Sequence, residues 1–189
     1  GLALGEKLSN MGYGLGILAN EGLWGVKVPV FSNEKLPGID PKLGPRMMST
    51  GESLGLSSNV SDALNDALLG AGWNPPEHGR ILLSVADSHK SETMPIASQF
   101  LSLGWSLYAT SGTALYLKRW GIHAEEVKPE EIVDMLRSGK LDMMLNIPGG
   151  NERHISQGAE LRRNACSCGI PCLHSMPAVW AVAASLRKS

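Results

Sequence analysis

The chain has 189 residues, 43% of them apolar and 19% charged, and a formal net charge of −1 at pH 7. This composition is typical of a globular protein that buries a core, and the near-neutral charge argues against nucleic acid as a partner. No run of about 18 apolar residues is present, so we expect no membrane span.

The start of the chain lacks the charged and apolar regions of a signal peptide, and it has no initiator Met. We therefore expect a fragment of a longer chain. Residues 24–31 alternate as a strand, which Pro29 places near an edge or a bulge. Apolar residues from Val60 to Leu68 follow helical spacing, and Ser58 or Asn59 can cap that helix.

Between the strand and the helix we expect a loop-rich stretch, LPGIDPKLGPRMMSTGES. Two or three elements cannot bury a core alone. Residues 1–70 are therefore predicted to be the tail of a domain whose body is missing, and the Gly- and Pro-rich residues 71–78 are predicted to be a linker.

Strand and helix signals alternate from residue 79 to the end of the chain. The predicted strands cover residues 81–85, 105–109, 123–127, 141–145 and 170–173. The predicted helices include Ile96, Ala97, Phe100 and Leu101 on one face, residues 113–119, Ile132, Val133 and Leu136 on one face, residues 158–167, and a final helix with Ala178, Val179, Val182 and Leu186. Five strands alternating with helices predict an α/β domain at residues 79–189, with a parallel sheet covered by helices.

Several predicted strands end in residues suited to a small anion. These residues are Lys90, Thr110, Ser111, Gly112, Thr113, Lys128 and Asn146. The carboxyl ends of parallel strands share one crevice, so these side chains are expected to converge there. Lysine charges, hydroxyl donors and a helix N-terminus together suit a phosphate. Taken alone, Thr110 to Thr113 are also explained as a helix cap.

Other polar residues are weighed against simpler roles. Asp87, His89 and Lys90 are compatible with an acid–base cluster, but we favour a solvated loop. His154 and His174 are expected to be solvated too. Arg162 and Arg163 on a predicted helix are able to reach an anion, but we favour a surface ion pair. Pro148 to Asn151 allow close approach to a base or sugar, or simply form a turn.

Cys166, Cys168 and Cys172 fall within seven residues. This clustering fits reduced thiols in a cytosolic or organelle-matrix protein better than a disulfide framework. A zinc site with His174 is an alternative, but zinc sites prefer C-x2-4-C pairs. We expect no metal and treat the three cysteines as small apolar residues.

These residues lead to a family resemblance that covers nearly the whole chain. Within residues 24–56, KVPVFSNEKLPGIDPKLGPRMMSTGES resembles the end of the second ATP-grasp unit of the carbamoyl phosphate synthetase large subunit. The runs ILLSVADSHK, LGWSLYATSGTALYL, LDMMLNIPGG and LRRNACSCGIPCLHS resemble its C-terminal regulatory domain. The resemblance implies a methylglyoxal-synthase-like fold, with a five-stranded parallel sheet between helices, preceded by the α+β tail of an ATP-grasp domain.

The resemblance implies a regulatory region that binds a phosphorylated effector, of the UMP or IMP type, and modulates ATP-dependent carbamoyl phosphate synthesis. Relatives hold the nucleotide phosphate with residues that match Lys90, Thr110, Thr113 and Lys128, with the positions of Asn146 and Pro148 nearby. Relatives carry a Thr where this chain has Pro148, and the connection after Lys128 is short. Arg46 replaces a usual Glu, and Lys27 argues against activation by ornithine.

The family's ATP and metal ligands lie upstream, so we expect no cofactor and no activity in this chain itself. ATP, Mg or Mn, and K belong to the parent enzyme. The implied partners are the rest of the large subunit, a glutaminase small subunit or domain, and a nucleotide monophosphate, with an oligomer possible. The implied location is cytoplasmic, or the mitochondrial matrix for an enzyme of the urea-cycle type.

Alternative functions remain open at this point. A lyase resembling methylglyoxal synthase needs an Asp where this chain has Asn151, and an amide cannot abstract a proton. A domain that binds N-acetylglutamate carries a Trp in place of Lys128 and an Asn-rich stretch in place of residues 148–150. A cyclohydrolase domain of purine synthesis has a similar threonine loop, but the S-T-G-E segment and the chain end argue against it. The pathway, whether pyrimidine, arginine or urea synthesis, stays open.

Overall fold

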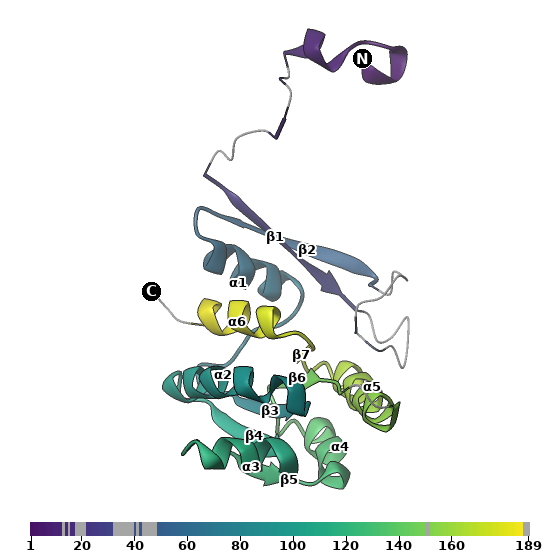
Figure 1. Ribbon diagram of the computed structural model, residues 1–189. Helices are drawn as coiled ribbons and strands as arrows, with labels where there is room; N and C mark the ends of the chain where they lie inside the picture. Colours follow the sequence, from purple (N-terminus) through teal and green to yellow (C-terminus); the bar gives the residue numbers. More distant parts are fainter. Residues whose placement is uncertain are drawn as a thin grey trace.

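The computed structural model describes residues 1–12, 14, 16–17, 22–31, 40, 42, 49–149 and 152–186 (Figure 1). The strands are β1 (Trp24–Val30), β2 (Gly51–Ser57), β3 (Arg80–Val85), β4 (Ser106–Thr110), β5 (Glu125–Val127), β6 (Met143–Ile147) and β7 (Cys172–Leu173). The α-helices are α1 (Val60–Gly70), α2 (Lys90–Ser102), α3 (Ser111–Arg119), α4 (Pro129–Arg137), α5 (Glu152–Ser167) and α6 (Met176–Ser185). Short 3-10 helices cover Leu2–Leu4, Leu8–Met11 and Asp87–His89.

The larger of the two sheets among the described residues is five-stranded and parallel, in the order β5-β4-β3-β6-β7. Strand β3 lies in the middle, pairing Leu82 with Tyr108 of β4 on one side and with Met144 of β6 on the other. Its apolar run is buried on both faces, as a parallel sheet between helices requires. The predicted α/β fold class is confirmed.

Two hydrophobic cores cover the two faces of this sheet. Ile81 and Leu83 of β3 point to the first core, which contains Phe100 of α2, Leu117 of α3 and Val179 of α6. Leu82 points the other way, because side chains alternate along a strand, and packs in the second core. The second core contains Met144, Ile132, Leu136 and Ala165, so α4 and α5 cover that face.

The upstream part forms a second, smaller sheet. Strands β1 and β2 pair antiparallel, from Trp24 opposite Ser57 to Val30 opposite Gly51. The expectation of loop up to Ser53 is therefore wrong for residues 51–53, where β2 begins. Gly55 faces α1, and a Cβ built on it would lie 2.7 Å from the Ala67 nitrogen and closer still to the Ala63 carbonyl oxygen. Strand β2 has small residues on this face because the backbone of α1 lies against it. Gly and Ser have low strand propensity, so the sequence did not predict this strand.

Helix α1 joins this small sheet to the rest of the chain. Asn59 caps it, accepting a hydrogen bond of 2.8 Å from the Ser61 nitrogen, as predicted. The helix lies alongside α6 (Figure 1), where the Asn65 side chain donates to the Ser185 carbonyl oxygen at 2.8 Å. Leu68 belongs to the first core. The upstream segment therefore shares a core with the α/β part, and the domain division at residues 71–78 stays a prediction.

Element boundaries shift by a few residues from the predicted ones. Helix α5 begins at Glu152 rather than at residue 158, and β5 begins at Glu125 rather than His123. Leu101 lies on the exposed side of α2 instead of on its buried face, whereas Ile96, Ala97 and Phe100 are fully buried. Within the described part of the chain, no helix has both the length and the apolar character that crossing a membrane requires.

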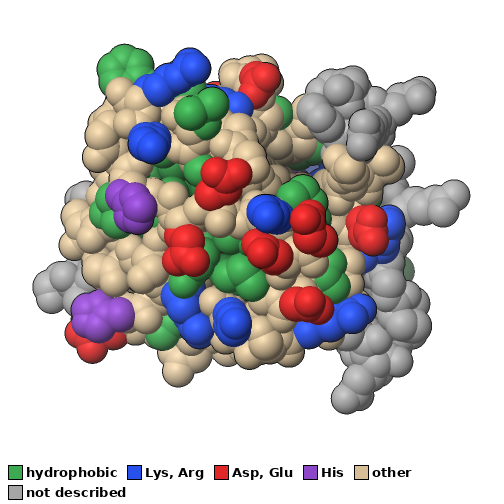
Figure 2. Space-filling view, turned by 90° about the horizontal axis from the view of Figure 1, so that it is seen from below, with side chains coloured by type: hydrophobic (Ala, Val, Ile, Leu, Met, Phe, Trp, Pro, Cys, Tyr) green, Lys and Arg blue, Asp and Glu red, His purple; other side chains and the backbone are tan. Residues whose placement is uncertain are grey.

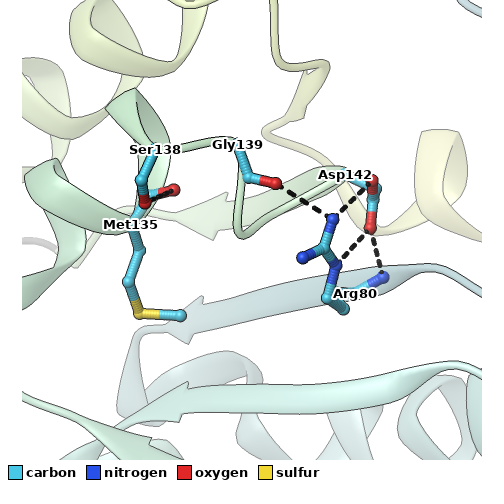
Figure 3. Close-up of polar contacts among 5 residues, drawn as sticks. All are labelled: Arg80, Met135, Ser138, Gly139 and Asp142. Atoms are coloured by element: carbon cyan, nitrogen blue, oxygen red, sulfur yellow. Dashed lines mark hydrogen bonds and ion pairs between the residues drawn. The ribbon is translucent and has the colours of Figure 1, made fainter.

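An ion pair fixes the amino-terminal edge of the sheet (Figure 3). The Arg80 guanidinium donates to Asp142 at 2.9 and 3.2 Å and to the Gly139 carbonyl oxygen at 3.0 Å. The Arg80 backbone nitrogen donates to the same carboxylate at 2.8 Å. These contacts join the start of β3 to the segment that leads into β6, so the two strands are held in register at the edge opposite to the cavity described next.

Candidate anion-binding site

A cavity of about 660 Å³ opens at the carboxyl ends of β3, β4 and β6. Six of the eight predicted site residues line it: Lys90, Thr110, Gly112, Thr113, Asn146 and Pro148. The parallel register explains the convergence, because Ser84 and Val85 at the end of β3 lie opposite Asn146 and Ile147 of β6. The predicted residues Ser111 and Lys128 are both exposed and are not part of this wall.

Lys90 supplies the positive charge of the cavity. It begins α2, and only 15% of its side chain is exposed. A Cβ built on Gly112 would lie 3.0 Å from the Lys90 Nζ, so the ammonium group lies directly over the first turn of α3. The ammonium also pairs with the carboxylate of Asp87, whose side chain is 93% exposed. A lysine charge thus meets the unpaired N–H groups of a helix N-terminus, which is a favourable place for an anion.

The two threonines of this turn have different surroundings. Thr113 is buried, and its hydroxyl accepts a hydrogen bond of 3.2 Å from the Val85 nitrogen. Its Oγ1 lies 3.4 Å from the Val85 carbonyl oxygen and 3.3 Å from the Thr110 hydroxyl. Thr113 therefore fastens the start of α3 to the end of β3. Thr110 is partly exposed at the cavity, and its hydroxyl donates to the Thr113 Oγ1; rotation about its C–O bond would turn this hydrogen toward a ligand.

The orientation of the Asn146 amide follows from a neighbouring arginine. Asn146 is buried at the end of β6, and its Oδ1 accepts a hydrogen bond of 2.8 Å from Nη1 of Arg162 on α5. A guanidinium group only donates, so the amide must turn its oxygen to Arg162. The Asn146 NH2 group is then left as a donor in the cavity wall.

Arg162 contradicts the expectation of a surface ion pair, since only 1% of its side chain is exposed. Its Nε and Nη2 donate to the two carboxylate oxygens of Asp40, both at 2.7 Å. Asp40 also accepts a hydrogen bond of 3.0 Å from the Lys42 nitrogen. Burial raises the pKa of Asp40, but the hydrogen bonds and positive charge around it outweigh that effect and lower the pKa below its ordinary value. No sequence spacing links Asp40 to Arg162, so sequence reasoning missed this pair.

Lys128 is not among the residues that line the cavity, although the next residue, Pro129, is. Lys128 precedes α4, and its backbone nitrogen donates to the Glu131 carboxylate at 3.2 Å. On the face of the molecule that Figure 2 shows, positively and negatively charged side chains lie among one another rather than in separate patches. The sequence around Lys128 is acidic, with Glu125 and Glu126 before it and Glu130 after it. Helix α4 instead gives the cavity Ile132 and Val133, and α5 gives Leu161, an apolar wall that sequence reasoning did not assign.

The histidines and cysteines that the sequence analysis considered do not form a second site among the described residues. The His89 Nδ1 lies 2.9 Å from a Glu92 oxygen in an exposed pair. His174 is half-buried rather than solvated, and burial, followed by the charge of Arg162, lowers its pKa. Burial raises the pKa of Cys172 to about 12. No group of three potential metal ligands occurs among the described residues. Arg46 and Asn151 lie outside the described residues, as does the side chain of His154.

Comparison with known proteins covers most of the residues that line this cavity. Residues 92–174 match the model of the MGS-like domain family. The carbamoyl phosphate synthase large chain of Lachnoclostridium phytofermentans is 38% identical to this chain over 190 residues, which cover 98% of this chain and 18% of the relative. The large chains of Thermoanaerobacter sp. (strain X514) and Agathobacter rectalis are 37% and 35% identical, over 99% and 100% of this chain and 17% and 18% of theirs.

A crystal structure of methylglyoxal synthase from Elizabethkingia anophelis aligns with 60% of this chain and 80% of its own, with a TM-score of 0.44 and 13% identity. The chain spans less than a fifth of the length of the curated relatives it matches. It carries an MGS-like domain and is homologous, over nearly its whole length, to part of the carbamoyl phosphate synthase large chain.

Proposed function

We propose that the chain is the regulatory, effector-binding region of a carbamoyl phosphate synthase large chain. In this proposal the cavity binds a phosphorylated effector of the UMP or IMP type, and binding modulates ATP-dependent carbamoyl phosphate synthesis elsewhere in the parent enzyme. The homology to large chains supports the identity of the parent. The chemistry of the cavity wall supports the class of ligand.

The observation that carries the proposal is the position of Lys90 over Gly112. A phosphate monoester has a charge of about −1.5 to −2 at pH 7. A largely buried ammonium group, the N–H groups at the start of α3, the Thr110 hydroxyl and the Asn146 NH2 group together offer donors to several phosphate oxygens. Hydrogen bonds to charged groups are worth about 1.5–3 kcal/mol each, enough to hold a small anion.

The rest of the cavity suits the remainder of a nucleotide. Its volume of about 660 Å³ falls in the range of roughly 300–1,000 Å³ that small-molecule sites occupy. Ile132, Val133 and Leu161 give an apolar wall for a base, while Gln157 and the backbone at Pro148 offer polar contacts for a sugar. The Pro148 position lacks the hydroxyl that a Thr would supply, so we expect weaker binding than in relatives with Thr.

Regulation requires that the effector bind one state of the enzyme better than another. We propose that residues 1–70 are the tail of an ATP-grasp domain, and that ATP, magnesium or manganese, and potassium act only in the parent chain. The rest of the large chain and a glutaminase subunit or domain are the proposed partners. The chain itself is then expected to show no ATP turnover above a blank without protein.

Calorimetric titration of the chain with UMP, IMP, inorganic phosphate and N-acetylglutamate tests the proposal. We expect UMP to bind most tightly, IMP next, and inorganic phosphate weakly but in competition with both. Binding of N-acetylglutamate without binding of UMP would contradict the nucleotide assignment and favour an enzyme of the urea-cycle type. Incubation with dihydroxyacetone phosphate tests the lyase alternative. Formation of methylglyoxal would contradict the regulatory assignment and favour a lyase.

A further inference from the structure

Arg162 connects two segments that are far apart in the sequence. It is the only Lys, Arg, Asp or Glu side chain that is buried among residues whose burial is described. Asp40 precedes it by 122 residues and lies in the segment upstream of α1, whereas Asn146 precedes it by 16 residues and lies in the cavity wall. One planar group thus contacts both the upstream segment and the candidate ligand site.

The geometry leaves the guanidinium group little freedom. Two of its nitrogens are held by the Asp40 carboxylate in a bidentate pair, and the third donates to Asn146. A Cβ built on Gly158 would lie 3.1 Å from Asn146 Oδ1 and 3.2 Å from Arg162 Nη1, so the α5 backbone packs closely against this contact. Because the guanidinium is rigid and planar, a movement of Asp40 that rotates it also moves the nitrogen that holds Asn146.

We propose that Arg162 is a positioning residue that couples Asp40 to ligand binding by fixing the Asn146 amide. The inference rests on the proposed function, because it assigns the Asn146 NH2 group to the bound anion. Coupling of this kind is reciprocal. A ligand that orders the Asn146 amide strengthens the contact of Arg162 with Asp40, and a displaced Asp40 weakens ligand binding.

A simpler electrostatic role for Asp40 predicts the opposite sign. The Asp40 carboxylate is a negative charge near an anion site, so its removal alone would strengthen phosphate binding. In the positioning role, removal of the carboxylate releases Arg162 and weakens binding. Asp40→Asn therefore distinguishes the two roles by the direction of the change.

A double-mutant cycle with UMP as the ligand tests the coupling in this chain. Asp40→Asn is expected to weaken UMP binding at least fivefold, the lower end of typical allosteric couplings. The same substitution is expected to have no effect on UMP affinity in an Asn146→Ala background, since the transmitting amide is absent. Asp66→Asn, which removes an exposed carboxylate of α1, is the charge-matched control and should leave the affinity unchanged. Stronger binding in Asp40→Asn, or an equal effect in both backgrounds, would overturn the proposal.

Asp40→Glu keeps the charge but lengthens the side chain by one methylene group, which disturbs the bidentate geometry. It is expected to weaken UMP binding as well, and an unchanged affinity would contradict the positioning role. This variant also decides the question if Asp40→Asn does not fold, which circular dichroism will show.

The side-chain amide signal of Asn146 in a two-dimensional 15N NMR spectrum tests the inference without ligand. We expect Asp40→Asn to shift this signal, and Asp66→Asn to leave it in place. If the wild-type chain binds neither UMP nor phosphate but the signal shifts, the proposed function fails while the coupling stands. An unmoved Asn146 signal in Asp40→Asn would refute the coupling whatever the ligand.

Discussion

The hydroxyl of Thr113 accepts a hydrogen bond of 3.2 Å from the backbone nitrogen of Val85, which joins the first turn of α3 to the last residue of β3. This contact gives the threonine loop a structural role beside its predicted role in binding. The loop is already held in place before any ligand arrives, so the donors of α3 are directed at the cavity without a cost of ordering.

Thr113→Val keeps the shape of the side chain but leaves the Val85 N–H group without its partner. We expect the free energy of unfolding to fall by about 1–3 kcal/mol, the cost of a buried unsatisfied polar group. Urea unfolding followed by circular dichroism measures it. Thr110→Val is the matched control, because that hydroxyl is partly exposed: it should weaken UMP binding but change stability by less than half as much. Equal losses of stability in both variants would count against this division of roles.

Gly55→Ala tests the packing of β2 on α1. The added methyl group would overlap the backbone of Ala63 and Ala67, so the strand and helix must separate. We expect a loss of about 1–3 kcal/mol or more in the free energy of unfolding, as for other overpacked sites. Gly51→Ala, in the same strand, has no atom within 4 Å of the new Cβ and should change stability little. If the two variants unfold at the same urea concentration, β2 does not lie against α1 as described.

The pair of Asp40 with Arg162 predicts a pH dependence of stability. The pKa of Asp40 lies below its ordinary value of 3.8, so the folded chain binds a proton there less readily than the unfolded chain does. The resulting stabilisation is fully present above pH 4 and is lost as the pH falls through the lower pKa of the folded state. Asp40→Asn should therefore be less stable than the wild type at pH 7, and the difference should shrink steadily below pH 4. A difference in unfolding free energy that stays constant down to pH 2 would contradict the ion pair.

Asp87→Asn tests whether the exposed carboxylate competes with a ligand for Lys90. Removal of the Asp87 charge frees the ammonium group and removes a repulsion from the incoming anion. Because the Asp87 side chain is 93% exposed, water screens its pair with the largely buried Lys90 and limits the pair to about 1 kcal/mol, so affinity for inorganic phosphate should rise by up to about fivefold. Titration at two salt concentrations measures the effect, which screening should reduce. Weaker phosphate binding in Asp87→Asn would assign that carboxylate a role in holding the ligand.

The sequence predicted the central sheet because its signals are local. The run Ile81–Val85 and the alternation of strands with helical faces identify a covered parallel sheet, and the sheet then brings Lys90, Thr110 and Asn146 to one edge. Strand β2 was missed because its buried face consists of Gly and Ser, whose small size serves contact with α1 and gives no hydrophobic alternation.

The contacts of Arg162 could not be predicted, because they depend on tertiary structure. The pairing with Asp40 spans 122 residues, and an arginine in a helix next to Arg163 is ordinarily exposed. For Lys128 the sequence suggested a role in the site rather than at the surface. Its position at a strand end and its match to relatives suggested a phosphate ligand, which stays a prediction, and its side chain is exposed where the chain enters α4.

Titration of Lys90→Ala with UMP, beside the wild type and Lys118→Ala, tests the central claim of a phosphate site at Lys90 most directly. Loss of the charge-assisted contact should weaken UMP binding about tenfold or more. Lys118→Ala removes an exposed lysine charge from the last turn of α3, the helix whose first turn lies beside Lys90, and should bind as the wild type does. Lys128→Ala should weaken binding less than Lys90→Ala, because its side chain is exposed. Wild-type UMP affinity in Lys90→Ala would contradict the phosphate site.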